Sequence, residues 1–399
     1  MEPIVVVGGG LAAARATETL RSQGYDGDLV VVTGEPETPY ERPPLSKDYL
    51  RGQADRGDLR TLDPQWYVDH AVDLRTSTTA TGLDVAGHSL TTAPGGSLQY
   101  SRLLLATGSR VRRLDVPGGG LEGVHSLRSV ADADRLADAL ASDGPVVVVG
   151  DGWIGMEVAA SARQLGRDVT LVGRGARPLG ALGDEVAAIF AAEHEAHGVR
   201  LLAGRTVTAF EGTDRVTGVT LDDGVTLEAS TVVVGIGVTP EVGLAQAAGI
   251  DLRGADDGGG IVVDGTLRTS APDVWAAGDI AAVPSPRYGR PLRIEHWAVA
   301  DETGKHAALS MLGSGAEYDV LPYFFSDQLE LGMEAKGLTE GEVVLSGAAA
   351  DRECVAFWVD GGRVQGAMGI NVWDRMDDAE ELIRREGPVS RDELAGFVG

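Results

Sequence analysis

Two short apolar runs, each followed by a glycine-rich turn and an amphipathic stretch, stand out in the pattern of hydrophobic and polar positions. The runs are Ile4–Val7 and Val146–Val149, and the turns cover residues 8–13 and 150–155. Continuous β-branched residues are typical of strands buried on both faces of a parallel sheet. Each segment is therefore expected to form a strand, a tight turn and a helix, in that order.

The two helices that follow these turns are expected to bury one face each, because apolar residues recur at helical spacing. On the first helix, residues 11–22, this face comprises Ala12, Ala16 and Leu20. On the second helix it comprises Ile154, Val158, Ala162 and Leu165.

The glycines give this pattern a chemical meaning. The first allows the tight turn, the second lets a pyrophosphate approach the backbone, and the third lets helix and strand pack closely. The pyrophosphate then lies against the unpaired N–H groups and positive dipole of the helix N-terminus. Two such units predict that one chain binds two dinucleotides and passes hydride between them.

The remaining pattern predicts the fold class. Further buried strands are expected at 29–32, 103–105, 169–172 and 232–234, with short strands in 260–280, a loop at 284–291 and a helix at 299–312. From residue 317 the alternation indicates antiparallel strands at 343–345, 354–359 and 363–370, a turn at 360–362, and helices at 377–385 and 391–397. We expect an α/β protein with two Rossmann-like dinucleotide-binding domains and a C-terminal α+β domain with an antiparallel sheet. The predicted boundaries are 1–112 with 246–316 for the first, 113–245 for the second and 317–399 for the third.

Composition narrows the class of protein. A hydrophobic content of 43% and a charged content of 24% are ordinary for a globular enzyme. The net charge of −26 argues against nucleic acid and anionic membranes as partners. No apolar run approaches the roughly 18 residues that span a bilayer, and the first strand begins too early for a signal peptide. A cytoplasmic protein is expected.

Cysteine content excludes several kinds of redox chemistry. Cys354 is the single cysteine, so the chain forms no internal disulfide, Cys-x-x-Cys pair or cysteine-ligated iron–sulfur cluster. No metal site is predicted either, because His194 and His197 lack a recognisable further set of ligands in the sequence. Electrons from a bound flavin would therefore not leave through a dithiol of this chain.

Several motifs in a fixed order resemble those of one enzyme family, and the likeness covers essentially the whole chain. They are Gly8-x-Gly10-x-x-Ala13, Arg42-Pro-Pro-Leu-Ser-Lys47, Ala106-Thr-Gly108, Gly150-x-Gly152-x-x-Gly155-x-Glu157, Ala277-Gly-Asp279 and Phe324-Phe-Ser-Asp-Gln328. This set resembles the FAD-dependent ferredoxin reductases of the putidaredoxin-reductase and oxygenase-coupled type, within the glutathione-reductase-like flavoproteins. The resemblance implies an NAD(P)H:ferredoxin oxidoreductase. Hydride would pass from NAD(P)H to FAD, and single electrons from FAD to a small iron–sulfur ferredoxin that supplies a cytochrome monooxygenase or Rieske dioxygenase.

The resemblance also implies which residues hold FAD. The first glycine turn would bind the pyrophosphate, with the Ala12 amide at the phosphates, and Glu35 would accept the ribose hydroxyls. Asp279 would bind the ribityl chain, and the planar forks of Arg42 and Arg128 suit phosphate oxygens. The full implied set is Gly8, Gly10, Ala12, Ala13, Glu35, Arg42, Lys47, Ala80, Thr107, Gly108, Arg128, Gly278, Asp279, Trp297 and Phe325.

Lys47 and Glu157 are the residues implied to act in the reaction. In the family they meet beside the reactive ring of the flavin, where a cation stabilises the negative charge of the reduced ring. Trp297 and Phe325 would flank the ring system and exclude water. The family commonly has tryptophan at the position of Phe325, which puts a part for this residue in electron transfer in doubt.

The second nucleotide unit departs from the pattern of NAD-specific proteins. The expected acidic residue after its second strand is missing, since Gly173-Arg174-Gly175-Ala176-Arg177 follows the strand. A glycine leaves room there, and Arg174 with Arg177 could clamp a 2′-phosphate, which favours NADPH over NADH. The implied nicotinamide-nucleotide set is Gly150, Gly152, Ile154, Gly155, Glu157, Arg174, Arg177 and Gly237.

Plain structural roles stay open for several of these residues. Glu35 could be a loop carboxylate, Glu157 a helix-surface charge, and the two aromatic residues ordinary core residues. Arg42, Arg128 and Arg174 could be solvated surface arginines, and so could the arginines that could form a ferredoxin-docking patch, Arg110, Arg112, Arg113, Arg287, Arg290 and Arg293. With Arg174 solvated, NADH would still bind through the remaining contacts.

Other functions in the same fold class are distinguished by their chemistry. A disulfide or thiol-peroxide reductase needs a cysteine beside the flavin, and this chain has Ser46 and no cysteine nearby. A reductase of a small radical or quinone stays open, as does a redox-sensing flavoprotein that binds its cofactors without turnover. The sequence does not distinguish a monomer from a homodimer.

Overall fold

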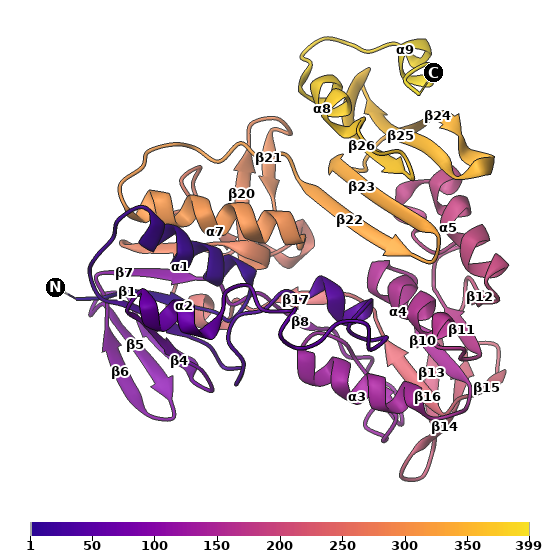
Figure 1. Ribbon diagram of the computed structural model, residues 1–399, viewed down its shortest axis with the longest axis horizontal. Coiled ribbons are helices and arrows are strands. Elements are labelled where there is room, and N and C mark those ends of the chain that lie inside the picture. Colours follow the sequence, from indigo (N-terminus) through magenta and orange to yellow (C-terminus); the bar gives the residue numbers. More distant parts are fainter. Residues whose placement is uncertain (1, 399) are drawn as a thin grey trace. The chain divides into compact units, whose positions relative to one another are not determined.

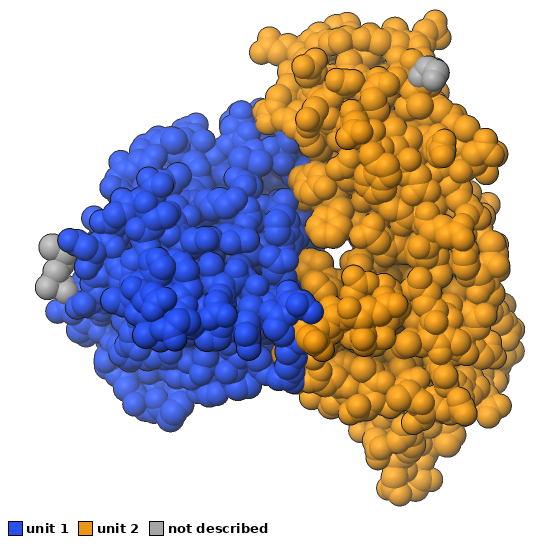
Figure 2. Space-filling model, viewed as in Figure 1, with its two compact units in different colours: residues 1–41, 56–110, 239–322 blue, residues 42–55, 111–238, 323–399 orange. Residues whose placement is uncertain are grey.

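The computed structural model describes residues 2–398 of the chain. The chain divides into two compact units, coloured separately in Figure 2. Unit 1 comprises residues 1–41, 56–110 and 239–322, and unit 2 comprises residues 42–55, 111–238 and 323–399. The division into three domains at the boundaries expected above stays a prediction.

Unit 1 is built on a five-stranded parallel sheet with the order β19-β7-β1-β2-β3. Its strands are Ile4–Val7 (β1), Leu29–Val32 (β2), Val72–Arg75 (β3), Arg102–Leu105 (β7) and Val274–Ala276 (β19). Every residue of β1 and β2 is buried, which explains their unbroken β-branched sequences.

Two helices of unit 1, α1 (Leu11–Ser22) and α7 (Trp297–Met311), pack against each other (Figure 1). Their close approach requires a glycine: a Cβ on Gly304 would lie 2.4 Å from the backbone oxygen of Ala12. Ala12, Ala16 and Leu20 of α1 are buried, as expected from the spacing. The short helices are α2 (Pro64–Asp69), α6 (Gly243–Ala247) and the 3-10 turns η3 (Ala255–Asp257) and η4 (Gly278–Ile280).

Two small sheets complete unit 1. One joins Thr79–Asp84 (β4), Ser89–Ala93 (β5) and Gly96–Gln99 (β6), and the other joins Ile261–Val262 (β18), Ala281–Ser285 (β20) and Arg290–Leu292 (β21). Ser109–Val111 (β8) and Val238–Pro240 (β17), which cross the sequence boundaries of the two units, pair in a two-stranded sheet.

Unit 2 contains a second five-stranded parallel sheet, with the order β12-β11-β10-β16-β9. Its strands are Val124–His125 (β9), Val146–Val149 (β10), Val169–Val172 (β11), Arg200–Leu202 (β12) and Thr231–Val234 (β16). The helices of this part are α3 (Val130–Ala141), α4 (Trp153–Gln164) and α5 (Asp184–Ala196), with η1 (Pro43–Ser46) and η2 (Gly180–Leu182). An antiparallel sheet of Val207–Gly212 (β13), Val216–Leu221 (β14) and Thr226–Glu228 (β15) lies beside them.

The end of the chain forms a five-stranded antiparallel sheet with the order β22-β23-β26-β25-β24, orange to yellow in Figure 1. The strands are Tyr323–Gln328 (β22), Leu331–Gly337 (β23), Glu342–Ala348 (β24), Glu353–Asp360 (β25) and Arg363–Ile370 (β26). The 3-10 turn η5 (Ala349–Asp351) precedes β25, α8 (Met376–Arg384) packs on β23 and β26, and α9 (Arg391–Ala395) packs on β24. The fold class expected from the sequence is confirmed.

Two local predictions are wrong. Ile154 was expected on the buried face of α4, but it is 44% exposed, because it lies in the first turn of the helix, within the glycine-rich segment. Residues 284–291 were expected to be a loop, but Pro284 pairs with Pro291 in a hairpin of β20 and β21. The prolines are tolerated because β21 is an edge strand and Pro284 lies beyond the residues of β20 that pair with β18.

No helix in residues 2–398 is long and apolar enough to cross a membrane.

Candidate functional site

The first glycine turn, between β1 and α1, offers its backbone to a ligand. Gly8 has φ +150°, and a Cβ there would lie 2.2 Å from the backbone oxygen of Ala106, so only glycine fits. Gly10 is the N-cap of α1 and provides no side-chain cap, and a Cβ on it would meet no atom within 4 Å. The first N–H groups of α1, including those of Ala12 and Ala13, therefore have no capping side chain as partner.

Polar groups follow the neighbouring strand ends of unit 1. Glu35 lies just past β2, and its carboxylate accepts a hydrogen bond from the Tyr40 hydroxyl (2.5 Å). Thr107 follows β7 and donates its hydroxyl hydrogen to the backbone oxygen of Glu241 (2.6 Å), beside Gly108 with φ +67°. The parallel sheet thus brings these predicted residues to the same edge as the glycine turn.

The segment after β19 belongs to the same edge. Asp279 lies in η4, and the N–H of Gly278 donates to the Thr303 hydroxyl of α7 (2.9 Å). Trp297 is the first residue of α7, two residues earlier than the helix start expected from the sequence. Its neighbour His296 is partly buried, and the loss of water around the imidazole lowers its pKa to about 4 and keeps the ring neutral at neutral pH.

Three other predicted FAD ligands, Ala80, Arg42 and Arg128, belong to segments outside the five-stranded sheet of unit 1. Ala80 is on β4 of unit 1. Arg42 and Arg128 belong to unit 2, where the Arg42 guanidinium donates to the backbone oxygen of Arg128 (2.5 Å). Arg128 directly precedes Ser129, the N-cap of α3, which forms a capping box with Asp132.

The second glycine turn, between β10 and α4 in unit 2, repeats the geometry of the first. A Cβ on Gly150 would lie 2.2 Å from the backbone oxygen of Gly235, and one on Gly155 would lie 2.1 Å from that of Gly150. Gly152 caps α4 without a side chain, and a Cβ on it would meet no atom within 4 Å. Gly237, which follows β16, has φ +95°.

Lys47 and Glu157 form a buried ion pair in unit 2. Lys47 Nζ lies 2.8 Å from Glu157 Oε1, and the two side chains are 12% and 6% exposed. Two hydroxyl groups complete the surroundings of the carboxylate: Ser46 donates to Oε2 (2.5 Å) and Ser326 donates to Oε1 (2.6 Å). The Glu157 carboxylate is thus fixed by one cation and two hydroxyls, and charge-assisted hydrogen bonds of this kind are the strong ones.

The hydrogen bonds continue from Ser326 into the interior. The Gln328 amide donates to the Ser326 hydroxyl (3.1 Å), and Gln328 Oε1 lies 3.0 Å from Nε2 of the buried His194. Burial lowers the pKa of His194 to about 4, so this ring is neutral at neutral pH. Phe325 lies beside the cluster, with Lys47 Nζ 6.0 Å from its ring centroid.

Sequence reasoning missed the parts of Ser46, Ser326 and Gln328. Alternation along β22 could have indicated that Ser326 and Gln328 share a face, since both are buried while Asp327 between them is exposed. Nothing local indicates that this face meets α4.

The predicted 2′-phosphate clamp is on the surface of unit 2. Arg174 and Arg177 are exposed, and neither makes a hydrogen bond or ion pair with any residue in 2–398. The predicted docking arginines are more varied: Arg293 is held by the backbone oxygen of Asp279 (3.0 Å) and by Glu295 (2.6 Å), whereas Arg113 is exposed.

His197 has neighbours that the sequence did not reveal. Ligand atoms of Glu193, His197 and Glu330 lie within 4.8 Å of one another. Arg352 Nη1 pairs with both carboxylates, at 2.5 Å from Glu193 and 3.4 Å from Glu330. The guanidinium supplies the positive charge that these carboxylates need.

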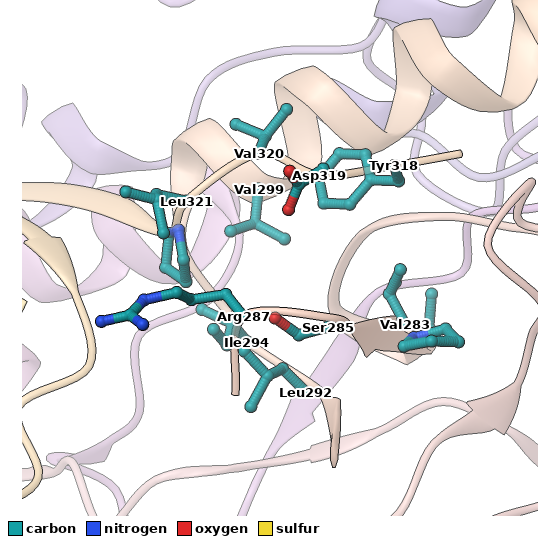
Figure 3. Close-up of a pocket in the computed structure, with 13 residues that line it drawn as sticks. Val283, Ser285, Arg287, Leu292, Ile294, Val299, Tyr318, Asp319, Val320 and Leu321 are labelled. Atoms are coloured by element: carbon teal, nitrogen blue, oxygen red, sulfur yellow. The ribbon is translucent and has the colours of Figure 1, made fainter. Parts of the chain in front are cut away.

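A separate pocket lies in unit 1, and Figure 3 shows the hairpin residues Ser285, Arg287 and Leu292 facing Val299 of α7 and the segment around Val320. None of the residues predicted to bind FAD or the nicotinamide nucleotide lines it.

Cys354 lies in β25, fully buried, and burial raises the pKa of its thiol to about 11. The one thiol is therefore protonated and inaccessible.

Two family profiles match the chain. Residues 2–304 match "Pyridine nucleotide-disulphide oxidoreductase" and residues 323–396 match "Reductase C-terminal". Rhodocoxin reductase of Rhodococcus erythropolis is 36% identical over 398 residues, covering 98% of this chain and 92% of the relative. The chloroplastic/mitochondrial monodehydroascorbate reductase of Arabidopsis thaliana is 37% identical over 389 residues, covering 91% of this chain and 78% of the relative. Among solved structures, the covalent putidaredoxin reductase–putidaredoxin complex has a chain with a TM-score of 0.94 and 33% identity, covering 99% of this chain and 95% of that chain.

Proposed function

Because the chain belongs to the pyridine nucleotide-disulphide oxidoreductase family, we propose that it is an FAD-dependent NAD(P)H:ferredoxin reductase. It takes hydride from NAD(P)H and passes single electrons to a small iron–sulfur ferredoxin that supplies an oxygenase. The observation that carries the proposal is the pair of bare glycine turns, each on its own parallel sheet, in a chain whose one thiol is buried and protonated. Since NAD(P)H is a cosubstrate of the cell interior, we also infer a cytoplasmic location.

The residues of unit 1 fit FAD. A side chain at Gly10 would project into open space, and the helix that Gly10 caps has no capping side chain. A pyrophosphate needs both this space and free N–H groups at a helix N-terminus. Glu35 offers a carboxylate past β2 for ribose hydroxyls, and Asp279 lies at the end of β19 on the same sheet edge. When bound, FAD supplies an acceptor that takes two electrons at once and releases them singly.

Lys47 supplies positive charge in a site with little water. Its side chain is 12% exposed, so its attraction for a developing negative charge is weakly screened. Glu157 holds the ammonium in place, and Ser46 and Ser326 hold Glu157. The hydroxyl of Ser46 donates to this carboxylate, so its oxygen positions the pair and does no thiol-type chemistry.

A second function is favoured by one specific observation, the likeness to a monodehydroascorbate reductase at 37% identity. Reduction of a small radical or a quinone would use the same nicotinamide and FAD sites and would not need a protein-docking surface. A redox-sensing role would instead give slow reduction by NAD(P)H and a persistent charge-transfer complex.

The choice of acceptor is tested by steady-state turnover. Purified, FAD-loaded protein is mixed with NADH or NADPH and either a [2Fe–2S] ferredoxin, ascorbyl radical or benzoquinone, with an acceptor-free reaction as the control. We expect kcat/KM for the ferredoxin to exceed that for either small acceptor by at least about tenfold, because complementary protein surfaces raise the association rate. A higher kcat/KM for a small acceptor would favour the second function.

A further inference from the structure

The loop after β11 receives a carboxylate from a different part of unit 2. Its own sequence has glycine at 173 and 175, but Asp151 of the glycine turn reaches across to it. Asp151 Oδ2 accepts the backbone N–H of Gly175 (2.9 Å), and the N–H of Leu179 donates to the backbone oxygen of Asp151 (2.8 Å). The glycine turn and the loop are therefore tied together through one residue.

The two glycines of the loop make room for this carboxylate. A Cβ on Gly173 would lie 2.5 Å from both Cβ and Oδ2 of Asp151, and a Cβ on Gly175 would lie 3.0 Å from Oδ2. Any side chain at 173 would displace the Asp151 carboxylate. The carboxyl group thus occupies the space beside the end of β11, where an acidic residue of that strand accepts ribose hydroxyls in NAD-specific units.

The Asp151 carboxylate retains an acceptor for a ligand. Oδ2 is engaged by Gly175, whereas Oδ1 has no hydrogen-bond partner within residues 2–398, and the residue is half-buried. Arg174 and Arg177 belong to the same loop, but they are exposed and held by no hydrogen bond or ion pair to the described residues. The negative charge is therefore held in position by a hydrogen bond, whereas the positive charges are exposed to solvent.

We propose that Asp151 determines which nicotinamide dinucleotide the second glycine turn accepts. Its carboxylate receives the adenosine ribose hydroxyls of NADH and repels the 2′-phosphate of NADPH. The inference rests on the proposed function, since it assigns the cosubstrate of that reaction. Arg174 and Arg177 led us to expect a preference for NADPH, and this proposal reverses it. No acidic residue follows β11 in the sequence, but Asp151 of the glycine turn places a carboxylate there.

Binding of two fragments without nicotinamide tests this preference directly. ADP-ribose and 2′-phospho-ADP-ribose are titrated calorimetrically into FAD-loaded protein at one fixed salt concentration. The wild-type chain is expected to bind ADP-ribose at least about tenfold more tightly than the 2′-phosphorylated fragment, because like charges in contact disfavour the wrong ligand. Equal binding, or tighter binding of the phosphorylated fragment, would overturn the proposal.

Asp151→Asn separates charge from shape. Asparagine keeps an oxygen for the N–H of Gly175 and removes the charge, so the ratio of the two dissociation constants should fall by at least about tenfold. Arg174→Gln is the matched control, and it should change this ratio less than Asp151→Asn does. A larger change in Arg174→Gln than in Asp151→Asn would restore the arginine clamp as the determinant. Neither fragment transfers hydride, so a failure of ferredoxin reduction would contradict the proposed function and leave these binding results standing.

Discussion

Replacing Lys47 with alanine is expected to slow reduction of the bound FAD by NAD(P)H at least about 100-fold, with FAD still bound. The physical reason is the loss of a preorganised positive charge in a poorly hydrated site, which typically costs a factor of that size. FAD is retained because the groups expected to bind its pyrophosphate are the N–H groups of α1 in unit 1. Anaerobic stopped-flow measurement of flavin absorbance after mixing with NADH or NADPH gives the rate.

Lys336→Ala is the control for this variant. Lys336 is also little exposed (16%) and also paired with carboxylates, Asp377 and Glu380 of α8, both at 2.8 Å. It should leave the rate of flavin reduction unchanged. Equal rates in Lys47→Ala and wild-type protein would remove the role of Lys47.

The stability of Lys47→Ala needs its own check. Removing the cation leaves the Glu157 carboxylate buried with hydroxyl partners alone, and breaking a buried pair in this way costs about 3–5 kcal/mol. The double variant Lys47→Met with Glu157→Gln removes both charges and should recover most of this free energy of unfolding. It should still reduce FAD slowly, so a normal rate in the double variant would also contradict the account.

Gly10→Val is expected to lower the affinity for FAD at least about 100-fold while the apoprotein stays folded. The backbone of Gly10 has φ −103° and ψ −174°, an extended conformation that valine adopts readily. A Cβ at this position would meet no neighbouring atom within 4 Å, so the substitution should introduce little strain into the folded protein. The branched side chain would instead occupy the space over the helix N-terminus that the pyrophosphate needs. The ratio of flavin to protein after gel filtration, with circular dichroism of the apoprotein, measures both effects.

Gly57→Val provides the comparison. A Cβ on Gly57 likewise meets no atom within 4 Å, and this glycine lies in an exposed loop of unit 1. We expect this variant to carry FAD at the wild-type ratio. A Gly10→Val protein that purifies with a full complement of FAD would show that the first turn does not hold the pyrophosphate.

The sequence predicted the parallel sheets and their helices well, because local pattern and tertiary structure agree there. The four β-branched residues of β1 and of β10 are buried on both faces, and a glycine is required wherever a Cβ would strike a neighbouring backbone oxygen. Such requirements are local, so they can be seen in the residues themselves. The order of the motifs then indicated the family.

Predictions failed or were missing where an outcome depends on how distant segments meet. Ile154 fits the helical spacing, yet it lies in the first turn of α4 and is exposed. Ser326 reaches Glu157 only because β22 lies beside α4, and the sequence contains no signal for that contact. In the sequence, Asp151 is one of the variable positions of a glycine turn. Its contact with the loop after β11 is visible only in the folded structure.

Anaerobic titration of the purified protein with NADH or NADPH tests the central claim that one flavin, with no sulfur relay, stands between nicotinamide and ferredoxin. We predict complete loss of the oxidised flavin absorbance after about one equivalent of the nucleotide per chain, since hydride carries two electrons and the chain holds no dithiol. Addition of oxidised [2Fe–2S] ferredoxin should then restore the absorbance. Uptake of two equivalents, or a protein whose absorbance does not change on adding either nucleotide, would contradict the account.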